Sequence, residues 1–449
     1  MDYIIEPAKR IPIDNEVDIC VLGGSCTGLF AAVRAARLGA KVAIVEKQNC
    51  FGGVATSGLV NIWHSLYDTL REKQIIGGLT YETIQRLNKR EAIEYIGKNK
   101  TGPFVLNTEE LKIELDELAK SSDIKIYFHT LYTAPYIEDG ELKAVFIENK
   151  SGRKAIKAKI FIDATGDGDL CASLGVPYTI PDKKQPPTTS AKIYRLHEKL
   201  SRKDFSNLII EYGREFGLEE DWGWAGGIPG IKELTFHAET HVFNVNCADA
   251  DQLTYSEIEG RRQIRAYMDI VRKYGPDEVK PHLVALASYI GVRETRHFCC
   301  KYRLTEEDLL YGRKFNDAVA NGSYRVDIHH EDKKGITLKN LDGREVYIRR
   351  GTPDVVTRWR KDDGYTNYYQ IPYRCLVPNG HFDNLLVCGR MIDADKGSFG
   401  AIRVMVNLNQ TGEAAGVAAY LALNNNSSVK ELNTDTIRKM LKQGGSIIF

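Results

Sequence analysis

Residues 17–32 read VDICVLGGSCTGLFAA. This pattern predicts a buried strand, a tight glycine turn and a helix. Gly23 allows the sharp exit from the strand, and Gly28 lets the helix pack closely on the sheet. The free N–H groups at the start of the helix, together with the positive end of its dipole, then form a binding place for a pyrophosphate.

The dinucleotide fingerprint G-x-G-x-x-G has its middle glycine where this chain has Ser25. A serine is small and its hydroxyl can donate to a phosphate oxygen, so we still predict a nucleotide cradle here. Gly39 ends the helix, and residues 41–45 (KVAIV) predict a second buried strand. Glu46 follows it, 18 residues after Gly28. A carboxylate at this place accepts hydrogen bonds from both hydroxyls of an adenosine ribose.

The whole chain has 449 residues with 61 basic and 60 acidic side chains. This length predicts two domains. Because the charges balance, we expect neither a nucleic-acid partner nor an anionic membrane surface. Residues 1–15 lack the apolar core of a signal peptide, and no run approaches the roughly 18 apolar residues of a membrane span.

The nine cysteines form no CxxC pair. An odd number of cysteines without that spacing is typical of a reducing compartment. We therefore predict a cytoplasmic protein.

Three more glycine-rich pieces follow the cradle. Residues 47–58 (KQNCFGGVATSG) predict a loop against which a flat ligand can lie. Residues 160–169 (IFIDATGDGD) predict a buried strand that ends in a glycine loop. Residues 385–389 (LLVCG) predict another buried strand, and residues 400–423 a helix whose small residues, among them Gly412 and Gly416, pack closely on a sheet. Residues 61–107 read as an amphipathic helical insertion.

These separated pieces together resemble the FAD-dependent oxidoreductases of the glutathione reductase and succinate dehydrogenase superfold, and in particular the bacterial FAD-dependent oxidoreductase family of about this length. The resemblance extends through residues 291–296 (GVRETR) and 302–308 (YRLTEED) and so covers most of the chain. It implies FAD as the cofactor, and it places a helix N-terminus near residues 401–403 at the pyrimidine end of the flavin. The cofactor residues that it implies are Gly23, Gly24, Ser25, Cys26, Thr27, Gly28, Glu46, Lys47, Gly52, Gly53, Val54, Ala55, Tyr132, Ala164, Thr165, Gly166, Asp167, Gly389, Arg390, Gly400, Ala401, Ile402 and Arg403. The first loop alone could instead hold NAD, but nothing would then require the C-terminal segment to return to it.

We predict an α/β fold in which a Rossmann-like FAD/NAD(P)-binding domain, with a parallel sheet and a β-meander, is interleaved with a smaller α+β substrate or cap domain. The FAD-binding domain comprises residues 15–60, 107–190 and 375–425. The substrate domain comprises residues 61–106 and 191–374, and residues 426–449 form a C-terminal extension.

Three residues are candidates for catalysis. His64 follows the flavin-side loop and could serve as an acid or base, or be a packed histidine. Arg293 follows residues 283–290, which predict a strand; with Glu294 and Arg296 it could clamp a substrate carboxylate or form a domain-interface salt bridge. Arg403 could stabilise negative charge on flavin or hold a substrate anion, or lie on the surface.

Other clusters are weaker. His237 and His241 stand four residues apart, but no third ligand appears at a recognisable spacing, so we predict no metal site. Cys299 and Cys300 are adjacent, which suits buried thiols better than a redox pair. Trp222 and Trp224 could form an aromatic lid or a core cluster.

The predicted function is hydride transfer between a small polar organic substrate and flavin N5, with a possible external electron acceptor or donor. The alternative is a FAD-bearing protein that modifies nucleic acid or binds without redox chemistry. Neither the substrate nor the oligomeric state follows from these residues.

Overall fold

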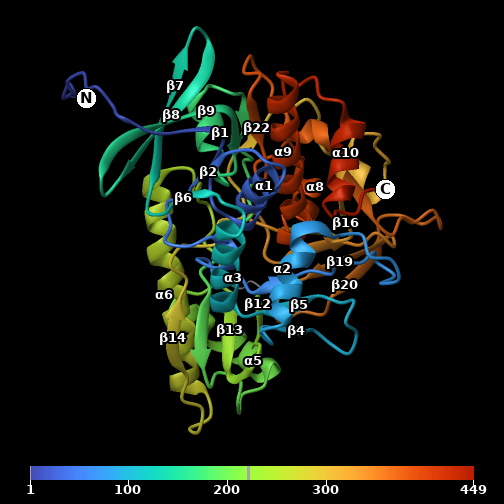
Figure 1. Cartoon of the computed structure of the whole chain (residues 1–449). Coiled ribbons are helices and arrows are strands. Elements are labelled where there is room, and N and C mark those ends of the chain that lie inside the picture. Colours follow the sequence, from blue (N-terminus) through green and yellow to red (C-terminus); the bar gives the residue numbers. More distant parts are fainter. Residues whose placement is uncertain (1, 220–222) are drawn as a thin grey trace.

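The computed structural model describes residues 2–219 and 223–449. Its central sheet has the strand order β6-β2-β1-β9-β8-β7, and β22 also pairs with β9 (Figure 1). The pairings among β1, β2, β6, β9 and β22 are parallel, whereas β7, β8 and β9 pair antiparallel as a meander. The bounds are β1 Ile13–Leu22, β2 Val42–Val45, β6 Lys125–Tyr127, β7 Leu131–Glu138, β8 Glu141–Asn149, β9 Gly152–Asp163 and β22 Leu385–Val387. This arrangement confirms the predicted fold class.

The helices that lie against this sheet, or against a helix that does, come from both ends of the chain. They are α1 (Cys26–Arg37), α3 (Thr108–Lys120), the short α4 (Asp169–Ser173), α9 (Met405–Asn425) and α10 (Thr434–Gln443). α9 packs on α1, β9 and α10. The small residues of α9 face the neighbouring helix α1, and not the sheet directly: a Cβ on Gly412 would lie 2.0 Å from the Thr27 carbonyl oxygen, and one on Gly416 would lie 2.2 Å from that of Ala31.

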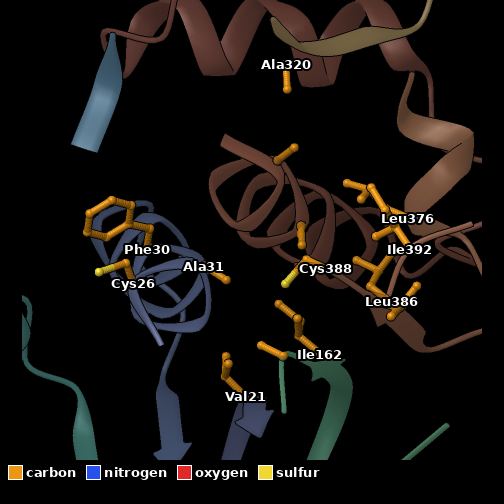
Figure 2. Packing of buried hydrophobic residues seen from close by; sticks show 14 of the residues in the cluster. Val21, Cys26, Phe30, Ala31, Ile162, Ala320, Leu376, Leu386, Cys388 and Ile392 are labelled. Carbon is orange, nitrogen blue, oxygen red and sulfur yellow. The ribbon is translucent and has the colours of Figure 1, made fainter. Parts of the chain in front are cut away.

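The main hydrophobic core lies where α1, α9 and the sheet meet. Figure 2 shows side chains of α1, the strands and the C-terminal third of the chain in one cluster, among them Phe30, Ala31, Val21, Ile162, Leu386 and Cys388. All six are fully buried. Because α1 and the segment that contains Leu386 and Cys388 are more than 300 residues apart in sequence, the core holds the two ends of the chain in one unit.

Two further four-stranded antiparallel sheets lie in the middle of the chain. One consists of β11 (Ala191–Tyr194), β12 (Trp224–Ile228), β13 (Ile231–Ala238) and β14 (His282–Leu286), with α5 (Arg202–Tyr212), η2 (Gly213–Phe216) and α6 (Ala250–Tyr274) beside it. The other consists of β17 (Val326–His329), β18 (Ile336–Lys339), β19 (Arg344–Ile348) and β20 (Val355–Arg358). The remaining elements are β10 (Tyr178–Thr179), β15 (His297–Phe298), β16 (Ala318–Gly322), β21 (Tyr369–Pro372), α7 (Glu306–Leu310), α8 (Lys396–Ile402), η1 (Gly53–Ala55) and η3 (Tyr373–Leu376).

The predicted helical insertion is mostly wrong. Residues 61–107 contain a single helix, α2 (Gly78–Asn88), and a small sheet of β3 (Ile62–Trp63), β4 (Ile93–Tyr95) and β5 (Phe104–Leu106). The Trp63 and Phe104 rings pack edge to face at 6.3 Å across that sheet. Aromatic pairs of this kind favour a pleated surface, and they override the helical periodicity.

Among the described residues, no helix is both long enough and apolar enough to cross a membrane.

Candidate active site

One large cavity of about 830 Å³ opens at the carboxyl ends of β1, β2, β9 and β22. Cofactor and ligand sites typically have volumes of ~300–1,000 Å³, and in open α/β sheets they lie at this edge. Most of the predicted site residues line it: Gly23, Ser25, Cys26, Thr27, Glu46, Lys47, Gly52, Gly53, Val54, Ala164, Thr165, Gly166, Asp167, Gly389 and Arg390, together with His64, Arg293 and Arg403.

Seven predicted residues do not line the cavity: Gly24, Gly28, Ala55, Tyr132, Gly400, Ala401 and Ile402. Gly28 lies directly behind the wall, where a Cβ would meet the Gly23 carbonyl oxygen at 2.0 Å. Tyr132 lies on the meander strand β7, and its hydroxyl is 2.5 Å from Ser173 Oγ. Gly400, Ala401 and Ile402 are buried within α8.

The first loop is shaped by close backbone contacts. Gly23 has φ +99°, and a Cβ there would lie 2.2 Å from the Ala164 carbonyl oxygen. Ser25 is the N-cap of α1, because its Oγ accepts from the Gly28 N–H at 3.3 Å. The hydroxyl proton of Ser25 is not used by this bond, so it can be donated into the cavity. Ser25, in place of the middle glycine of the fingerprint, therefore preserves the cradle and also caps α1.

Glu46 lies at the cavity wall directly after β2 and is buried. Its carboxylate accepts from the Gly24 N–H at 2.5 Å and from the Gln48 N–H at 2.7 Å. Burial raises the pKa of Glu46, although these backbone donors oppose that effect. Each carboxylate oxygen can accept a further bond, so the group retains the capacity to bind hydroxyl donors.

Charged side chains surround the loop after β9. Arg390 Nη2 lies 2.5 Å from Asp167 Oδ1, and Thr295 Oγ1 donates to the same oxygen at 2.8 Å. Burial alone would raise the pKa of Asp167, but the charges of Arg390 and Lys47 bring it below its ordinary value. Asp167 thus holds the Arg390 guanidinium in the cavity wall.

The long C-terminal helix, α9, begins at Met405, later than predicted, because a separate short helix, α8, precedes it. The Asp395 side chain caps α8 by accepting from the Ser398 N–H, so Gly400, Ala401 and Ile402 fall inside that helix and Arg403 is its C-cap. The helix N-terminus at the cavity is that of α9, whose N-cap is Val404. Val404 makes no side-chain cap bond, and Val404, Met405, Leu408 and Asn409 line the cavity. An uncapped helix N-terminus of this kind favours an anion.

The cavity also contains a polar cluster centred on Asp327 of β17. The Tyr324 hydroxyl donates to Asp327 Oδ2 at 2.6 Å, and Arg403 Nη2 lies 3.2 Å from the same oxygen. His329 Nε2 lies 3.5 Å from Oδ1. α8 can carry Arg403 to this point because Gly400 sits against the Asp327 backbone, where a Cβ would be only 2.8 Å from the carbonyl oxygen.

His64 completes this cluster. Its ring lies 4.1 Å from that of Tyr324. Burial lowers the pKa of His64 to about 3, and the charges of Arg403 and Arg325 act in the same direction. His64 is therefore neutral near pH 7 and can both donate and accept hydrogen bonds.

Arg293 lies in the same cavity but apart from this cluster. β14 ends at Leu286, earlier than predicted, because the chain turns to form a bridge between Gly291 and Thr188. Arg293 Nη1 is 2.5 Å from both the Pro186 carbonyl oxygen and Thr188 Oγ1.

The other two residues of the expected clamp point elsewhere. Glu294 Oε1 lies 2.9 Å from His297 Nε2, and Arg296 donates to the Asp167 carbonyl oxygen at 3.0 Å. The expected three-residue clamp is not formed.

Comparison with known proteins identifies the family. The family model described as FAD dependent oxidoreductase matches residues 18–441. The chain belongs to this family. The match confirms the predicted FAD cofactor and classes the chain with the FAD-dependent oxidoreductases.

The curated relatives match over shorter stretches. The mitochondrial dihydrolipoyl dehydrogenase of Schizosaccharomyces pombe is 29% identical over 193 residues, which are 40% of this chain and 33% of that protein. The thiamine thiazole synthase of Methanococcus aeolicus is 28% identical over 185 residues, which are 38% of this chain and 64% of that protein. The matched parts thus span less than two thirds of either relative.

Solved structures also resemble the chain. A geranylgeranyl bacteriochlorophyll reductase-like protein from Thermoplasma acidophilum is 10% identical, with a TM-score of 0.46 over 96% of this chain and 83% of that one. The p-nitrophenol 4-monooxygenase of Pseudomonas putida is 11% identical, with a TM-score of 0.46 over 95% of this chain and 84% of that one.

The cavity of this FAD dependent oxidoreductase family member fits its cofactor. Only glycine is accommodated at position 23, Glu46 retains acceptor capacity, and the helix N-termini of α1 and α9 both reach the cavity. These are the contacts that a dinucleotide with two phosphates and an anionic ring requires.

Several functional candidates were missed from the sequence: Tyr324, Arg325, Asp327 and His329. No motif surrounds them. Residues 326–329 (VDIH) do alternate apolar and polar side chains, and this alternation places Asp327 and His329 on one face of a strand.

The weaker clusters have structural explanations. His237 is fully buried between the rings of Phe205 and Tyr267, and burial lowers its pKa to about 4. In the described part of the chain, no group of His, Cys, Asp and Glu could hold a metal ion. Cys299 and Cys300 are free thiols, and Cys300 is buried.

The two tryptophans differ in what can be said of them. Trp222 lies outside the described residues. Trp224 lines the cavity with its ring 5.3 Å from that of Phe236.

Proposed function

We propose that this protein transfers a hydride between a small polar organic substrate and flavin N5 of bound FAD. The observation that carries the proposal is that one cavity joins the nucleotide cradle to the cluster around Asp327. A cofactor held along the cradle would thus reach a polar site lined by His64, Tyr324 and Arg403. A large cavity with convergent polar groups is typical of an enzyme site.

The cofactor residues have separate roles in this proposal. The N-terminus of α1 and Ser25 hold the pyrophosphate, while Glu46 holds the adenosine ribose. Arg390, positioned by Asp167 and Thr295, adds positive charge beside the loop after β9. The support for these roles is the burial and hydrogen bonding of each group at the cavity wall.

Positive charge is concentrated at the reacting end. Arg403 and the uncapped N-terminus of α9 stabilise negative charge beside them. His64 is neutral near pH 7, so it orients a substrate hydroxyl or carbonyl by hydrogen bonding and does not act as a cationic acid. Arg293 also contributes to the cavity wall.

We also propose the interleaved division into a FAD-binding domain (15–60, 107–190 and 375–425) and a substrate domain (61–106 and 191–374), with residues 426–449 as an extension. The segments 61–71 and 323–344 both supply cavity-lining residues, which supports a substrate role for them. An external electron acceptor or donor would complete the catalytic cycle.

The test is photometric. The purified protein should be yellow, release FAD on denaturation, and show anaerobic bleaching of the flavin band with at least one compound from a panel of hydroxy acids, sugars and amino acids. Arg403→Gln should retain FAD but slow the bleaching by about tenfold or more, because a charged hydrogen bond is lost in the transition state.

Two results would contradict the proposal. One is a protein that binds no FAD on reconstitution. The other is a FAD-loaded protein that is neither reduced nor reoxidised by any small molecule while it binds RNA tightly, which would favour a nucleic-acid-modifying function.

A further inference from the structure

Two adjoining segments, residues 64–71 and 323–325, contribute to the cavity wall. Ser323 Oγ donates to the Tyr67 carbonyl oxygen at 2.6 Å, and the His64 ring packs on Tyr324. These contacts fix the two segments against each other. Arg71 comes from the first segment and Arg325 from the second, and both line the cavity.

Arg71 and Arg325 differ from two other cavity-lining arginines, Arg344 and Arg403, in their ion pairs. Arg344 is 2.7 Å from Asp342, and Arg403 is 3.2 Å from Asp327. Within the described ranges, no carboxylate lies within ion-pair distance of Arg71 or Arg325. The cavity lining therefore includes two positive charges, on exposed side chains, that no carboxylate of the described residues balances.

The buried acidic side chain of the same turn, that of Asp68, does not pair with Arg71. Asp68 is buried, and its Oδ1 accepts from the backbone N–H groups of Glu72 and Lys73 at 3.0 and 3.3 Å. Arg71 also has φ +63°, a conformation that Gly or Asn adopts at lower cost. The turn by itself thus gives no reason for an arginine.

The Arg71 guanidinium lies directly beside Gly102. A Cβ on Gly102 would lie 2.4 Å from Arg71 Nη1, so the guanidinium rests against a glycine that leaves room for it. Pro103, the next residue, lines the cavity. The charge is therefore held at the cavity wall.

The cavity also has apolar lining residues. They include Ile62, Trp224, Phe236, Ile336 and Leu338. Apolar surface of this kind binds a hydrocarbon or aromatic body, whereas a guanidinium binds a carboxylate through two parallel hydrogen bonds.

We propose that the substrate is an organic carboxylate with an apolar body, whose carboxylate is bound by Arg325 and Arg71 and whose body lies on the wall of Trp224 and Phe236. The inference rests on the proposed function, since it names the substrate class of that site.

The test measures binding to the FAD-loaded protein by calorimetry and by perturbation of the flavin absorbance. The probes are benzoate, phenylacetate and hexanoate, each compared with its uncharged amide. The carboxylates should bind about tenfold or more tightly than the amides, and high salt should reduce the difference. Arg325→Gln and Arg71→Gln should each weaken carboxylate binding by about tenfold and leave amide binding unchanged.

A matched control is Arg265→Gln, because Arg265 is exposed on α6 and lies outside the cavity. This variant should bind both probe classes like the wild type. The inference is overturned if no carboxylate of the panel binds, if amides bind equally well, or if the two cavity variants keep the carboxylate preference.

The two proposals fail in different ways. Carboxylate binding that depends on Arg325 and Arg71, without flavin reduction by any compound, would leave the anion site standing and contradict hydride transfer. Flavin reduction by sugars or alcohols alone would support hydride transfer and contradict the carboxylate site.

Discussion

Glu46 shows how much chemistry one side chain contributes to this site. It is a buried carboxylate that accepts from two backbone N–H groups: that of Gly24, in the loop after β1, and that of Gln48, in the loop after β2. Burial raises its pKa, so the charged form needs every donor that it can find. Ribose hydroxyls are such donors, so in the proposed binding mode the hydrogen bonds to FAD would also stabilise the charged form of Glu46.

Glu46→Ala should weaken FAD binding by about tenfold to a hundredfold, because a charged hydrogen-bond acceptor is lost. The FAD-free variant should still fold, since its backbone neighbours lie in loops. The measurement is the dissociation constant of FAD together with the melting temperature of the FAD-free protein.

Glu114→Ala is the matched control for Glu46. Glu114 is also buried, but it pairs with Arg90 at 3.0 Å and does not line the cavity. Its loss should lower the melting temperature and leave FAD affinity unchanged. Equal FAD affinity in Glu46→Ala and the wild type would remove Glu46 from the cofactor site.

At the scale of elements, the contact of α1 with α9 positions both helix N-termini at the cavity. The two helices approach so closely that the backbone of α1 occupies the space where α9 would carry side chains. Any lateral shift of α9 would move Val404 and Met405 relative to the cradle. Stability and cofactor geometry therefore depend on the same glycines.

Gly412→Ala should destabilise the protein by about 2 kcal/mol or more, because the new Cβ would overlap the Thr27 carbonyl oxygen. In an open helix the same change stabilises by ~1 kcal/mol, so the sign itself is diagnostic. Urea unfolding measures the difference, and FAD affinity should fall with it.

Gly227→Ala gives the comparison for Gly412, because a Cβ at Gly227 meets nothing within 4 Å. We expect little change in its unfolding midpoint. A Gly412→Ala protein as stable as the wild type would show that α1 and α9 can separate without cost.

In the whole molecule, one buried ion pair joins distant parts of the chain. Arg34 of α1 contacts Glu413 of α9, and both are almost completely buried. Arg34 also donates to the Gly444 carbonyl oxygen at 2.9 Å, and Glu413 Oε1 accepts from the Leu79 N–H at 2.9 Å. The pair thus connects α1, α2, α9 and the segment after α10.

Arg34→Met should destabilise the protein by about 3–5 kcal/mol, since it leaves the Glu413 carboxylate buried without its cation. The double variant Arg34→Met with Glu413→Leu should recover part of that loss, because no buried charge remains. Urea unfolding of the single and double variants forms the test, and strictly additive losses would show that the two side chains do not act as a pair.

The local architecture of the nucleotide cradle could be predicted from the sequence because its determinants are close neighbours. Residues 17–32 and Glu46 specify a strand, a turn, a helix and an acidic strand end through apolar periodicity and glycine sterics. The same reasoning placed Asp167 and Arg390 at strand ends, and these lie at one edge of one parallel sheet. The family resemblance rested on these local patterns.

Only the tertiary structure decided which side chains form the cluster around Asp327. His64, Tyr324, Asp327 and Arg403 come from positions up to 339 residues apart and meet because β17 packs under α8. The Asp395 cap sets the boundary between α8 and α9, and the bridge between Gly291 and Thr188 ends β14 early, while Arg293 still lines the cavity. Sequence periodicity determines which elements form, whereas long-range packing determines which of their side chains meet, because the packing free energy depends on every element at once.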